Sequence, residues 1–173
     1  MRNTTIAFAF AAGTIATVPA AAQDMALSLE IPRLRVAEYH NPYVAIWIED
    51  EAGKHVSTLD VWYDVDLRGE DGAKWLPDMR TWWRRAGRSM SMPANGVSGP
   101  TQPPGKHTVQ FKQGSRPLGR LSAGSYRLKV EAAREVGGRE TVTIPFQWPP
   151  RGTQSGTASG SKELGDVRLT VRG

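Results

Sequence analysis

Four arginines lie close together in the middle of the chain and could bind an anion. Arg80, Arg84 and Arg88 recur every four residues, so a helix would align them along one face, and Arg85 lies beside them. A planar guanidinium group binds a phosphate or a carboxylate through two parallel hydrogen bonds. The spacing therefore predicts an anion-binding surface, and the alternative is that these arginines only keep one face of an amphipathic helix soluble.

Two tryptophans accompany the arginines. Trp83 continues the apolar face begun by Leu76 and Met79, at spacings of i, i+3 and i+7, whereas Trp82 lies off that face. We therefore expect Trp83 to pack against the body of the protein and Trp82 to lie at the edge or remain partly exposed. Together the tryptophans and arginines form a surface that could dock an anionic ligand or partner.

A polar loop follows the arginines. It is neither hydrophobic enough for a core strand nor charged enough for an ordinary solvated turn, and it reads S-M-S-M-P-A-N-G-V-S-G-P-T-Q-P-P-G from Ser89 to Gly105. Its Gly, Pro, Asn and Ser residues are those that turns prefer, so the simplest interpretation is a turn. With the preceding helix it makes Trp75–Gly105 the candidate functional segment.

No conventional catalytic motif is present in the sequence. It contains no G-x-S-x-G, H-E-x-x-H or P-loop pattern and no cysteine, and its histidines lie far apart at His40, His55 and His107. We expect the last two to be solvated, whereas His40 could be a weak metal or haem ligand. The acidic residues between positions 60 and 71 match no calcium-loop spacing. We therefore predict a non-enzymatic protein without metal-binding residues, with a metal chaperone as a minor alternative.

The candidate segment must be positioned by a chain that otherwise reads as short strands. Apolar and polar residues alternate from Ala26 to Leu34, as in a half-buried strand. Residues 42–49 and 56–63 are rich in β-branched and aromatic side chains and flank a polar turn with a glycine, which predicts a hairpin. One short helix is expected at 77–86, because Pro77 suits the first helical position and Gly87 the position after the last.

The second half of the chain predicts further strands. Residues 126–134 and 140–148 should form a hairpin around Gly137-Gly138, and 107–111 and 164–171 read as single strands. Residues 149–161 are rich in Gly and Ser and are expected to form a flexible connection. About seven strands with one inserted helix indicate an all-β immunoglobulin-like β-sandwich, with an open barrel as the alternative.

The first 22 residues have the features of a signal peptide. Arg2 precedes an apolar run from Ile6 to Val18, and P-A-A-A then predicts cleavage after Ala22. The run is shorter than the roughly 20 residues that a membrane helix needs, so we expect an exported, periplasmic domain of residues 23–173 that does not span a membrane. An N-terminal anchor that is never cleaved is the alternative.

Composition narrows the classes of partner. The formal charge is +5, one unit of which belongs to Arg2, so anionic partners are weakly favoured. Nucleic-acid binding is not expected, because no basic stripe interleaved with aromatic residues extends over a whole face. The absence of cysteine excludes a disulfide framework and any Cys-ligated metal site.

Three segments together resemble a known family. They read K-W-L-P-D-M-R-T-W-W-R-R-A-G-R, T-Q-P-P-G-K-H-T-V-Q-F and L-S-A-G-S-Y-R-L-K-V-E-A-A-R-E-V-G-G-R-E. From about Ala26 to Val171 the chain resembles the predicted periplasmic proteins of the family DUF2271. The L-S-A-G-S-Y-R-L segment also resembles the Ig-like domain of flagellar hook-capping proteins, which favours the sandwich.

The family resemblance implies a cofactor at the polar loop. N-G-V-S-G-P-T is similar to the D-x-x-[ST]-G-A-[ST] signature at which an FMN transferase attaches flavin through its phosphate. On this comparison Thr101 is the acceptor, Pro100 replaces the alanine of the signature and Asn95 replaces the aspartate. The cofactor-binding residues implied are Thr101, Ser98, Gly99 and Asn95 in the loop, and Trp82, Arg84 and Arg85 beside the flavin and its phosphate.

The resemblance also implies partners. Proteins of this kind accompany PepSY-type membrane reductases, FMN transferases and iron-uptake receptors. The expected function is therefore that of an accessory protein supporting extracytosolic electron transfer in iron or haem handling, with FMN carried covalently at Thr101. The alternative is a non-redox binding or interaction module that uses the Trp/Arg helix surface.

Overall fold

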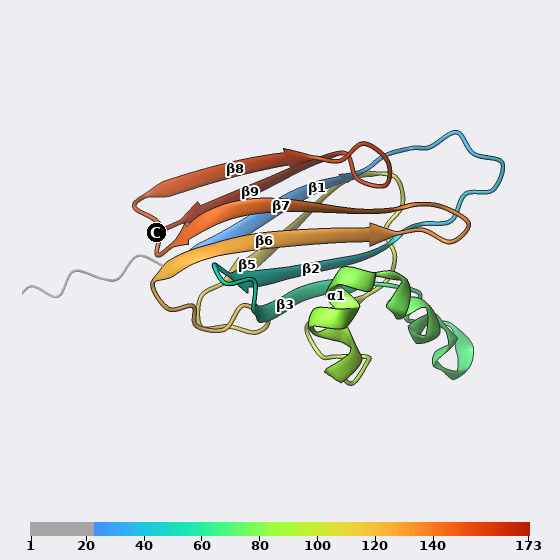
Figure 1. The fold of residues 1–173 in the computed structure, drawn as a ribbon, viewed down its shortest axis with the longest axis horizontal. Helices are drawn as coiled ribbons and strands as arrows, with labels where there is room; N and C mark the ends of the chain where they lie inside the picture. The colour runs from blue at the N-terminus through green and yellow to red at the C-terminus, as the bar shows by residue number, and fades with distance from the viewer. Residues whose placement is uncertain (1–22) are drawn as a thin grey trace, which may run out of the picture.

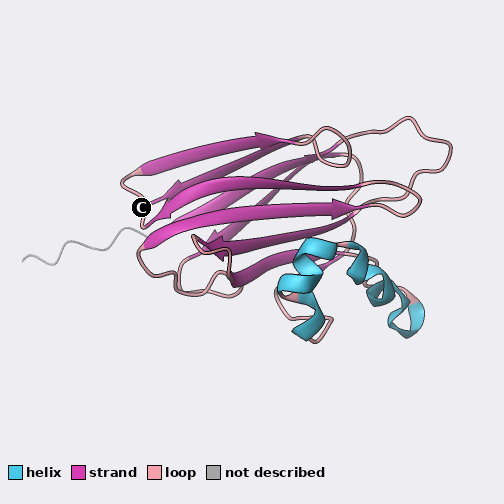
Figure 2. Cartoon of the chain, in the orientation of Figure 1, coloured by secondary structure: helices cyan, strands magenta, loops and turns pink. Residues whose placement is uncertain are grey.

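Two β-sheets packed face to face form the body of the protein (Figures 1 and 2). The structure is a computed structural model that describes residues 23–173, and for residues 69 and 70 it describes the backbone alone. The expected signal peptide, residues 1–22, lies outside the described residues. No helix in the described part of the chain is long and apolar enough to cross a membrane.

The first sheet has the strand order β5-β1-β9-β8, and the second has the order β4-β3-β2-β6-β7. Every pairing is antiparallel except that of β4 with β3, which is parallel. In chain order the strands are β1 (Asp24–Ile31), β2 (Tyr43–Asp50), β3 (His55–Trp62), β4 (Ser98–Gly99), β5 (Gly105–Lys112), β6 (Gly124–Ala133), β7 (Arg139–Trp148), β8 (Thr153–Ser159) and β9 (Asp166–Arg172).

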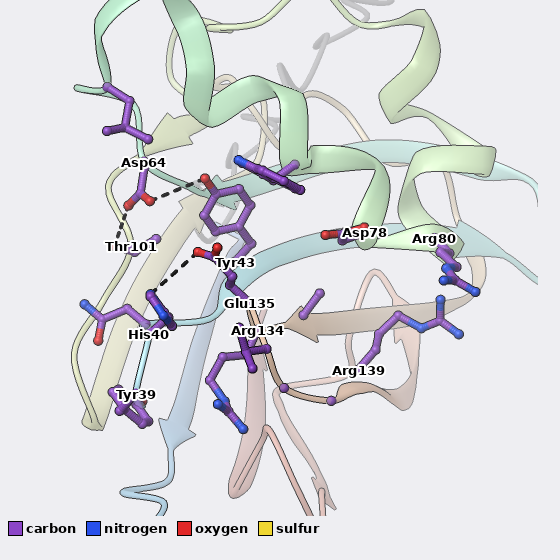
Figure 3. Close-up of a pocket in the computed structure, with 17 residues that line it drawn as sticks. Tyr39, His40, Tyr43, Asp64, Asp78, Arg80, Thr101, Arg134, Glu135 and Arg139 are labelled. Atoms are coloured by element: carbon purple, nitrogen blue, oxygen red, sulfur yellow. Dashed lines mark hydrogen bonds and ion pairs between the residues drawn. The ribbon is translucent and has the colours of Figure 1, made fainter. Parts of the chain in front are cut away.

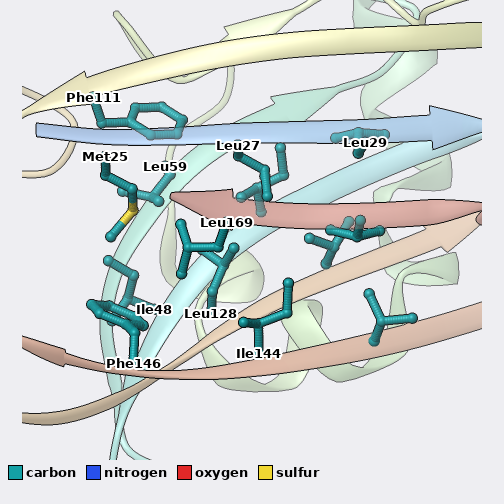
Figure 4. Packing of buried hydrophobic residues seen from close by; sticks show 14 of the residues in the cluster. Met25, Leu27, Leu29, Ile48, Leu59, Phe111, Leu128, Ile144, Phe146 and Leu169 are labelled. Atoms are coloured by element: carbon teal, nitrogen blue, oxygen red, sulfur yellow. The ribbon is translucent and has the colours of Figure 1, made fainter. Parts of the chain in front are cut away.

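The core between the sheets follows from the alternation in the sequence. In β1 every second side chain is buried, and the buried ones meet apolar side chains of the opposite sheet (Figure 4). Burying a Leu or Ile side chain completely stabilises the fold by about 1.5–3 kcal/mol, so this layer is the main source of stability. The prediction of an all-β sandwich with two hairpins is confirmed, whereas the immunoglobulin-like assignment stays a prediction.

The expected flexible connection at 149–161 is wrong, because β8 lies within it and pairs with β9 along its whole length. The small residues of β8 allow it to approach β7 closely. A Cβ atom at Gly156 would lie 2.5 Å from Cγ2 of Ile144, and the backbone N–H of Gln147 donates to Gln154 Oε1 at 3.0 Å. The low apolar content therefore reflects close packing at the edge of the sandwich, which composition alone does not distinguish from flexibility.

The one short α-helix expected at about 77–86 is confirmed, but it is shorter than predicted and is flanked by 3₁₀ segments. The segment folds as a 3₁₀ helix η1 (Arg68–Asp78), a short α-helix α1 (Arg80–Arg85) and a 3₁₀ turn η2 (Gly87–Ser89). Pro77 lies inside η1, and the backbone breaks at Met79, whose ψ is 68°. Because Arg88 belongs to η2, the stripe of Arg80, Arg84 and Arg88 along one α-helix does not form.

These helices cover the outer face of the five-stranded sheet, beside β2 and β3 (Figures 1 and 2). Every residue of β2 except Asp50 is therefore buried, since one face of the strand meets the other sheet and the opposite face meets the helices. The helices and the outer face of the sheet share a second apolar cluster of Tyr43, Ala45, Trp47, Val61, Tyr63, Leu76, Met79, Trp82, Ala86 and Ala133.

Candidate functional site

The burial of the two tryptophans of α1 is the reverse of the prediction. Trp82 is fully buried, and its indole Nε1 donates to Thr58 Oγ1 at 3.1 Å, while Trp83 is only half-buried. Gly87 packs under both rings, since a Cβ there would lie 2.7 Å from atoms of each. Trp82 therefore anchors the helix to the sheet, and the expectation that it stacks on a flavin is wrong because its ring is inaccessible.

A buried carboxylate holds the start of α1. Glu131 of β6 is 0% exposed, and its two oxygens accept the backbone N–H groups of Thr81, at 3.1 Å, and Trp82, at 2.7 Å. No side chain at the N-cap Met79 supplies these bonds, so the sheet caps the helix. Because Glu131 fixes α1, it also fixes the position of Arg80, the first residue of the helix.

The other predicted helix residues lie on the outer surface. Arg84 donates through Nε to the carbonyl oxygen of Arg80 at 3.2 Å, and Arg85 Nε lies 3.6 Å from Glu49 Oε1. Both arginine side chains are exposed. Neither lines the cavity described below, so the structure does not bring Arg84 and Arg85 together with Thr101.

The polar loop is tied to the edge of the second sheet. Ser98 and Gly99 form β4, where the backbone N–H of Tyr63 donates to the carbonyl oxygen of Gly99 at 3.0 Å. The Ser98 hydroxyl oxygen accepts the N–H of Ala94 at 2.9 Å, and Asn95 is exposed in the turn between them. In this structure Ser98 and Gly99 therefore shape the loop and hold it against β3.

Thr101 follows this strand and is half-buried at the wall of a cavity. Its hydroxyl donates to Asp64 Oδ1 at 3.3 Å. The Tyr43 hydroxyl donates to the carbonyl oxygen of Gly72 at 3.1 Å and lies 3.4 Å from Asp64 Oδ2. Burial, aided by the negative charge of Asp64, raises the pKa of Tyr43 to about 12, so the phenol stays protonated at neutral pH. Asp64 thus orients the Thr101 hydroxyl through a fixed hydrogen-bond network.

The cavity has a volume of about 860 Å³ and is lined by four parts of the chain. They are the end of the β1–β2 loop (39–43), the segment from β3 to α1 (64–80), Thr101, and the β6–β7 turn (133–139). Figure 3 shows Thr101, Asp64 and His40 toward one end and the guanidinium groups of Arg80 and Arg139 toward the other. The cavity is large enough for a small organic ligand and has opposite charges at its two ends.

Three exposed apolar side chains surround this cavity. Leu67 is 47% exposed, Trp75 54% and Val136 79%. Val136 also adopts φ 52°, a left-handed conformation that is strained for a β-branched residue. Large apolar side chains gathered at a charged cavity are typical of sites that bind a ligand with an apolar body and a polar group.

A buried ion pair supports the turn that carries Val136. The side chains of Arg134 and Glu163 are 5% and 3% exposed, and Arg134 Nε donates to Glu163 Oε2 at 2.9 Å. Glu163 Oε1 also accepts the backbone N–H of Gly138 at 2.7 Å, and the Tyr39 ring lies 5.7 Å from the Arg134 guanidinium carbon. Glu163 therefore fixes the cavity wall from the β8–β9 loop, far away in sequence.

Glu140 in turn holds the β8–β9 loop. Its carboxylate accepts the Ser161 N–H at 2.6 Å and the N–H groups of Lys162, Glu163 and Leu164, each at 3.0 Å. Burial alone would raise the pKa of Glu140, but these backbone donors together lower it below its ordinary value. The loop that presents Glu163 thus depends on an ionised Glu140.

We expect the stability that Glu140 contributes to be lost in acid. The folded pKa is below the unfolded value of 4.5, so the contribution is complete above about pH 4.5 and disappears as the pH falls through the folded pKa. Urea unfolding at several pH values checks this. At neutral pH Glu140→Ala should cost about 1.5–3 kcal/mol, and the difference from wild type should shrink in acid. A difference that is constant with pH would contradict the assignment.

The histidines make ordinary contacts. His40 Nε2 lies 3.0 Å from Glu38 Oε1, and His107 Nε2 lies 2.8 Å from the carbonyl oxygen of Pro103. His55, expected to be solvated, is half-buried; burial lowers its pKa, and its Nε2 lies 2.9 Å from Thr58 Oγ1. Among the residues that the structure describes, no three His, Cys, Asp or Glu side chains gather as metal ligands would. The geometry therefore gives the metal-chaperone alternative no support.

Sequence reasoning identified Thr101 and Arg80 but missed the cavity as a whole. Arg139 begins β7 and Glu131 lies in β6, positions at which a charged residue is ordinarily a solvated one. The sequence carries no signal for either residue, because the start of α1, whose free N–H groups Glu131 accepts, is known only from the structure.

Comparison with known proteins gives one match. Residues 24–166 match the family described as predicted periplasmic protein, DUF2271. No curated protein and no solved structure matches the chain. The family match covers β1 to β8, the first residue of β9 and the whole lining of the cavity. The chain belongs to the DUF2271 family of predicted periplasmic proteins.

Proposed function

We propose that this protein is a non-enzymatic periplasmic binding domain that retains a planar, anionic ligand in the cavity beside Thr101. The observation that carries the proposal is the meeting of an accessible hydroxyl, an exposed indole ring and two guanidinium groups, from Thr101, Trp75, Arg80 and Arg139, at one cavity of about 860 Å³. A pocket of this size with a few convergent polar groups is the usual form of a small-molecule site.

FMN attached to Thr101 is the first candidate for this ligand. The residues present fit the group in two respects: the Thr101 hydroxyl lies at the cavity wall, and the exposed ring of Trp75 could stack on a flavin. Arg80 and Arg139 lie toward the other end of the cavity, so they would not face a phosphate attached to Thr101 (Figure 3). When bound, FMN would supply electron transfer. Asp64 would orient the acceptor hydroxyl before attachment, since it accepts the Thr101 hydrogen bond.

Attachment would need a periplasmic FMN transferase and a flavin donor such as FAD. A phosphoester bond forms to Thr101 Oγ1, the pyrophosphate bond of the donor breaks, and AMP leaves with the hydroxyl proton. The loaded protein would then serve a PepSY-type membrane reductase in iron or haem handling. A covalent bond would keep a small cofactor from diffusing out of the periplasm.

Intact mass spectrometry tests the flavin proposal. After co-expression with an FMN transferase, the wild-type protein should gain the mass of one FMN group and absorb in the flavin bands, whereas Thr101→Ala should do neither. Thr108→Ala is a suitable control, because Thr108 lies in β5 and is not part of the cavity. An unmodified wild-type mass under these conditions would exclude covalent FMN.

The second candidate is a non-redox binding module that holds its ligand without a covalent bond. The opposite charges at the two ends of the cavity favour it, because the Asp64 carboxylate beside Thr101 would repel a flavin phosphate attached there. This candidate predicts protein without flavin absorbance and reversible binding at the cavity. On this proposal the ligand binds in the cavity, and not on the helix surface around Arg84 and Arg85 that the sequence predicted.

A further inference from the structure

We propose that Arg80 and Arg139 form a clamp for the anionic group of the ligand, a phosphate or a carboxylate, at the end of the cavity away from Thr101. The inference rests on the proposed function, in that it takes the cavity to be the ligand site. It adds where the charged end of the ligand lies and which side chains recognise it. It concerns a ligand held without a covalent bond, because the phosphate of an FMN group on Thr101 would lie at the opposite end of the cavity.

The two guanidinium groups face each other across the cavity end. Figure 3 shows the side chains of Arg80 and Arg139 pointing toward one another. Two like charges held side by side repel, and an anion between them removes the repulsion and adds charge-assisted hydrogen bonds. The planar fork of each guanidinium matches the oxygen geometry of a phosphate or a carboxylate.

Arg80 has no ion-pair partner among the side chains described for residues 23–173, and Arg139 has one long ion pair, with Glu131. Arg139 Nε lies 3.6 Å from Glu131 Oε1, beyond hydrogen-bond distance, and both oxygens of that carboxylate already accept N–H groups of α1. Asp78 lines the cavity as well, but within the same described set it pairs with neither arginine.

The backbone of both arginines is fixed in advance. Arg80 begins α1, whose first N–H groups are held by Glu131, and Arg139 begins β7, where it is paired with Ala133 of β6. A site whose backbone is already positioned loses less entropy when it binds a ligand. Only the two side chains, both partly exposed, have to adjust around the anion.

The other residues that line the cavity indicate the chemistry of the rest of the ligand. At the opposite end, Asp64 repels an anion and accepts hydrogen bonds. The exposed side chains of Leu67, Trp75 and Val136, which also line the cavity, offer apolar contact. The ligand class is therefore an organic anion with a flat or apolar body and one phosphate or carboxylate group. Inorganic phosphate alone would engage the clamp but not Trp75.

Calorimetric titration of the protein purified from the periplasm, without a co-expressed FMN transferase, tests the clamp. The probes are phenyl phosphate, benzoate, inorganic phosphate and phenol at low salt. We expect the two aromatic anions to bind more tightly than inorganic phosphate and phenol to bind least. Comparing phenyl phosphate with benzoate then identifies which anionic group the clamp prefers.

Matched variants separate the clamp from the rest of the cavity. Arg80→Gln and Arg139→Gln should each weaken binding of the preferred aromatic anion about tenfold or more, whereas Arg84→Gln, on the same helix but outside the cavity, should leave it unchanged. Arg139→Lys keeps the positive charge beside Glu131 and should weaken binding less than Arg139→Gln. Thermal unfolding checks that each variant is folded.

Two results would overturn the clamp. One is wild-type affinity in both glutamine variants, and the other is the absence of binding by both aromatic anions. If the first result is accompanied by weaker binding in Trp75→Ala, the cavity remains the ligand site and only the clamp is wrong. Failure of the flavin proposal shows separately, in the intact mass of wild type and Thr101→Ala.

Discussion

Replacing Glu163 by alanine is expected to lower the free energy of unfolding by about 3–5 kcal/mol, because it leaves Arg134 charged and buried without its partner. The two side chains are 5% and 3% exposed, and Arg134 Nη1 already has no hydrogen-bond partner among the described residues. The variant also frees the backbone N–H of Gly138. Urea unfolding of wild type and variant measures the loss.

Glu135→Ala is the matched control for this prediction. Glu135 lies in the same turn and also lines the cavity, but its side chain is 61% exposed and 3.6 Å from His40, so its removal should cost less than about 1 kcal/mol. A double variant, Arg134→Met with Glu163→Leu, should recover much of the stability, since no buried charge remains. A small effect of Glu163→Ala, comparable to that of the control, would show that the pair does not hold the turn.

Most strands could be predicted because their signals are local. The alternation at 26–34 and the glycines at 137–138 specify a half-buried strand and a hairpin within a few residues of sequence. Strand β8 lacks such a signal: its Gly156 fits closely against Ile144 of β7, in the other sheet, and this contact cannot be read from the segment itself. A small residue that is needed for a contact with another strand cannot be distinguished from a loop residue in the local sequence.

The bounds and the buried face of the predicted helix were wrong for a related reason. A continuous α-helix would align Leu76, Met79 and Trp83, whereas the structure buries Leu76, Met79 and Trp82, which recur every three residues. Three is the period of a 3₁₀ helix, and the segment is 3₁₀ up to Asp78 and breaks at Met79 before α1 starts. Packing against the outer face of the sheet, and not helix propensity, decides the phase of so short a segment.

The cavity could not be predicted from any local sequence pattern. Its walls come from residues 39–43, 64–80, 101 and 133–139, which the order of the strands brings to one end of the second sheet. Thr101 was found only because its loop resembles a known signature. Arg139 and the buried carboxylates that position the walls carry no signal of their own, since a charged residue in a strand is ordinarily a solvated one.

Trp82→Ala is expected to lower the free energy of unfolding by about 3–5 kcal/mol and to loosen α1 from the sheet. Its side chain is fully buried, and truncation leaves a large cavity and removes the hydrogen bond from its indole to Thr58. Because α1 carries Arg80 into the ligand cavity, the same change should also weaken binding of an aromatic anion.

Trp83→Ala is the control that makes this test decisive. The two rings are neighbours, with centroids 6.2 Å apart, and the substitutions are chemically identical, but Trp83 is only half-buried. We expect it to cost no more than about half as much as Trp82→Ala, since less apolar surface is lost. Denaturant unfolding of both variants measures the difference. A larger loss for Trp83→Ala would mean that α1 continues regularly from Pro77 and presents the opposite face to the sheet, which would also move Arg80 away from the cavity.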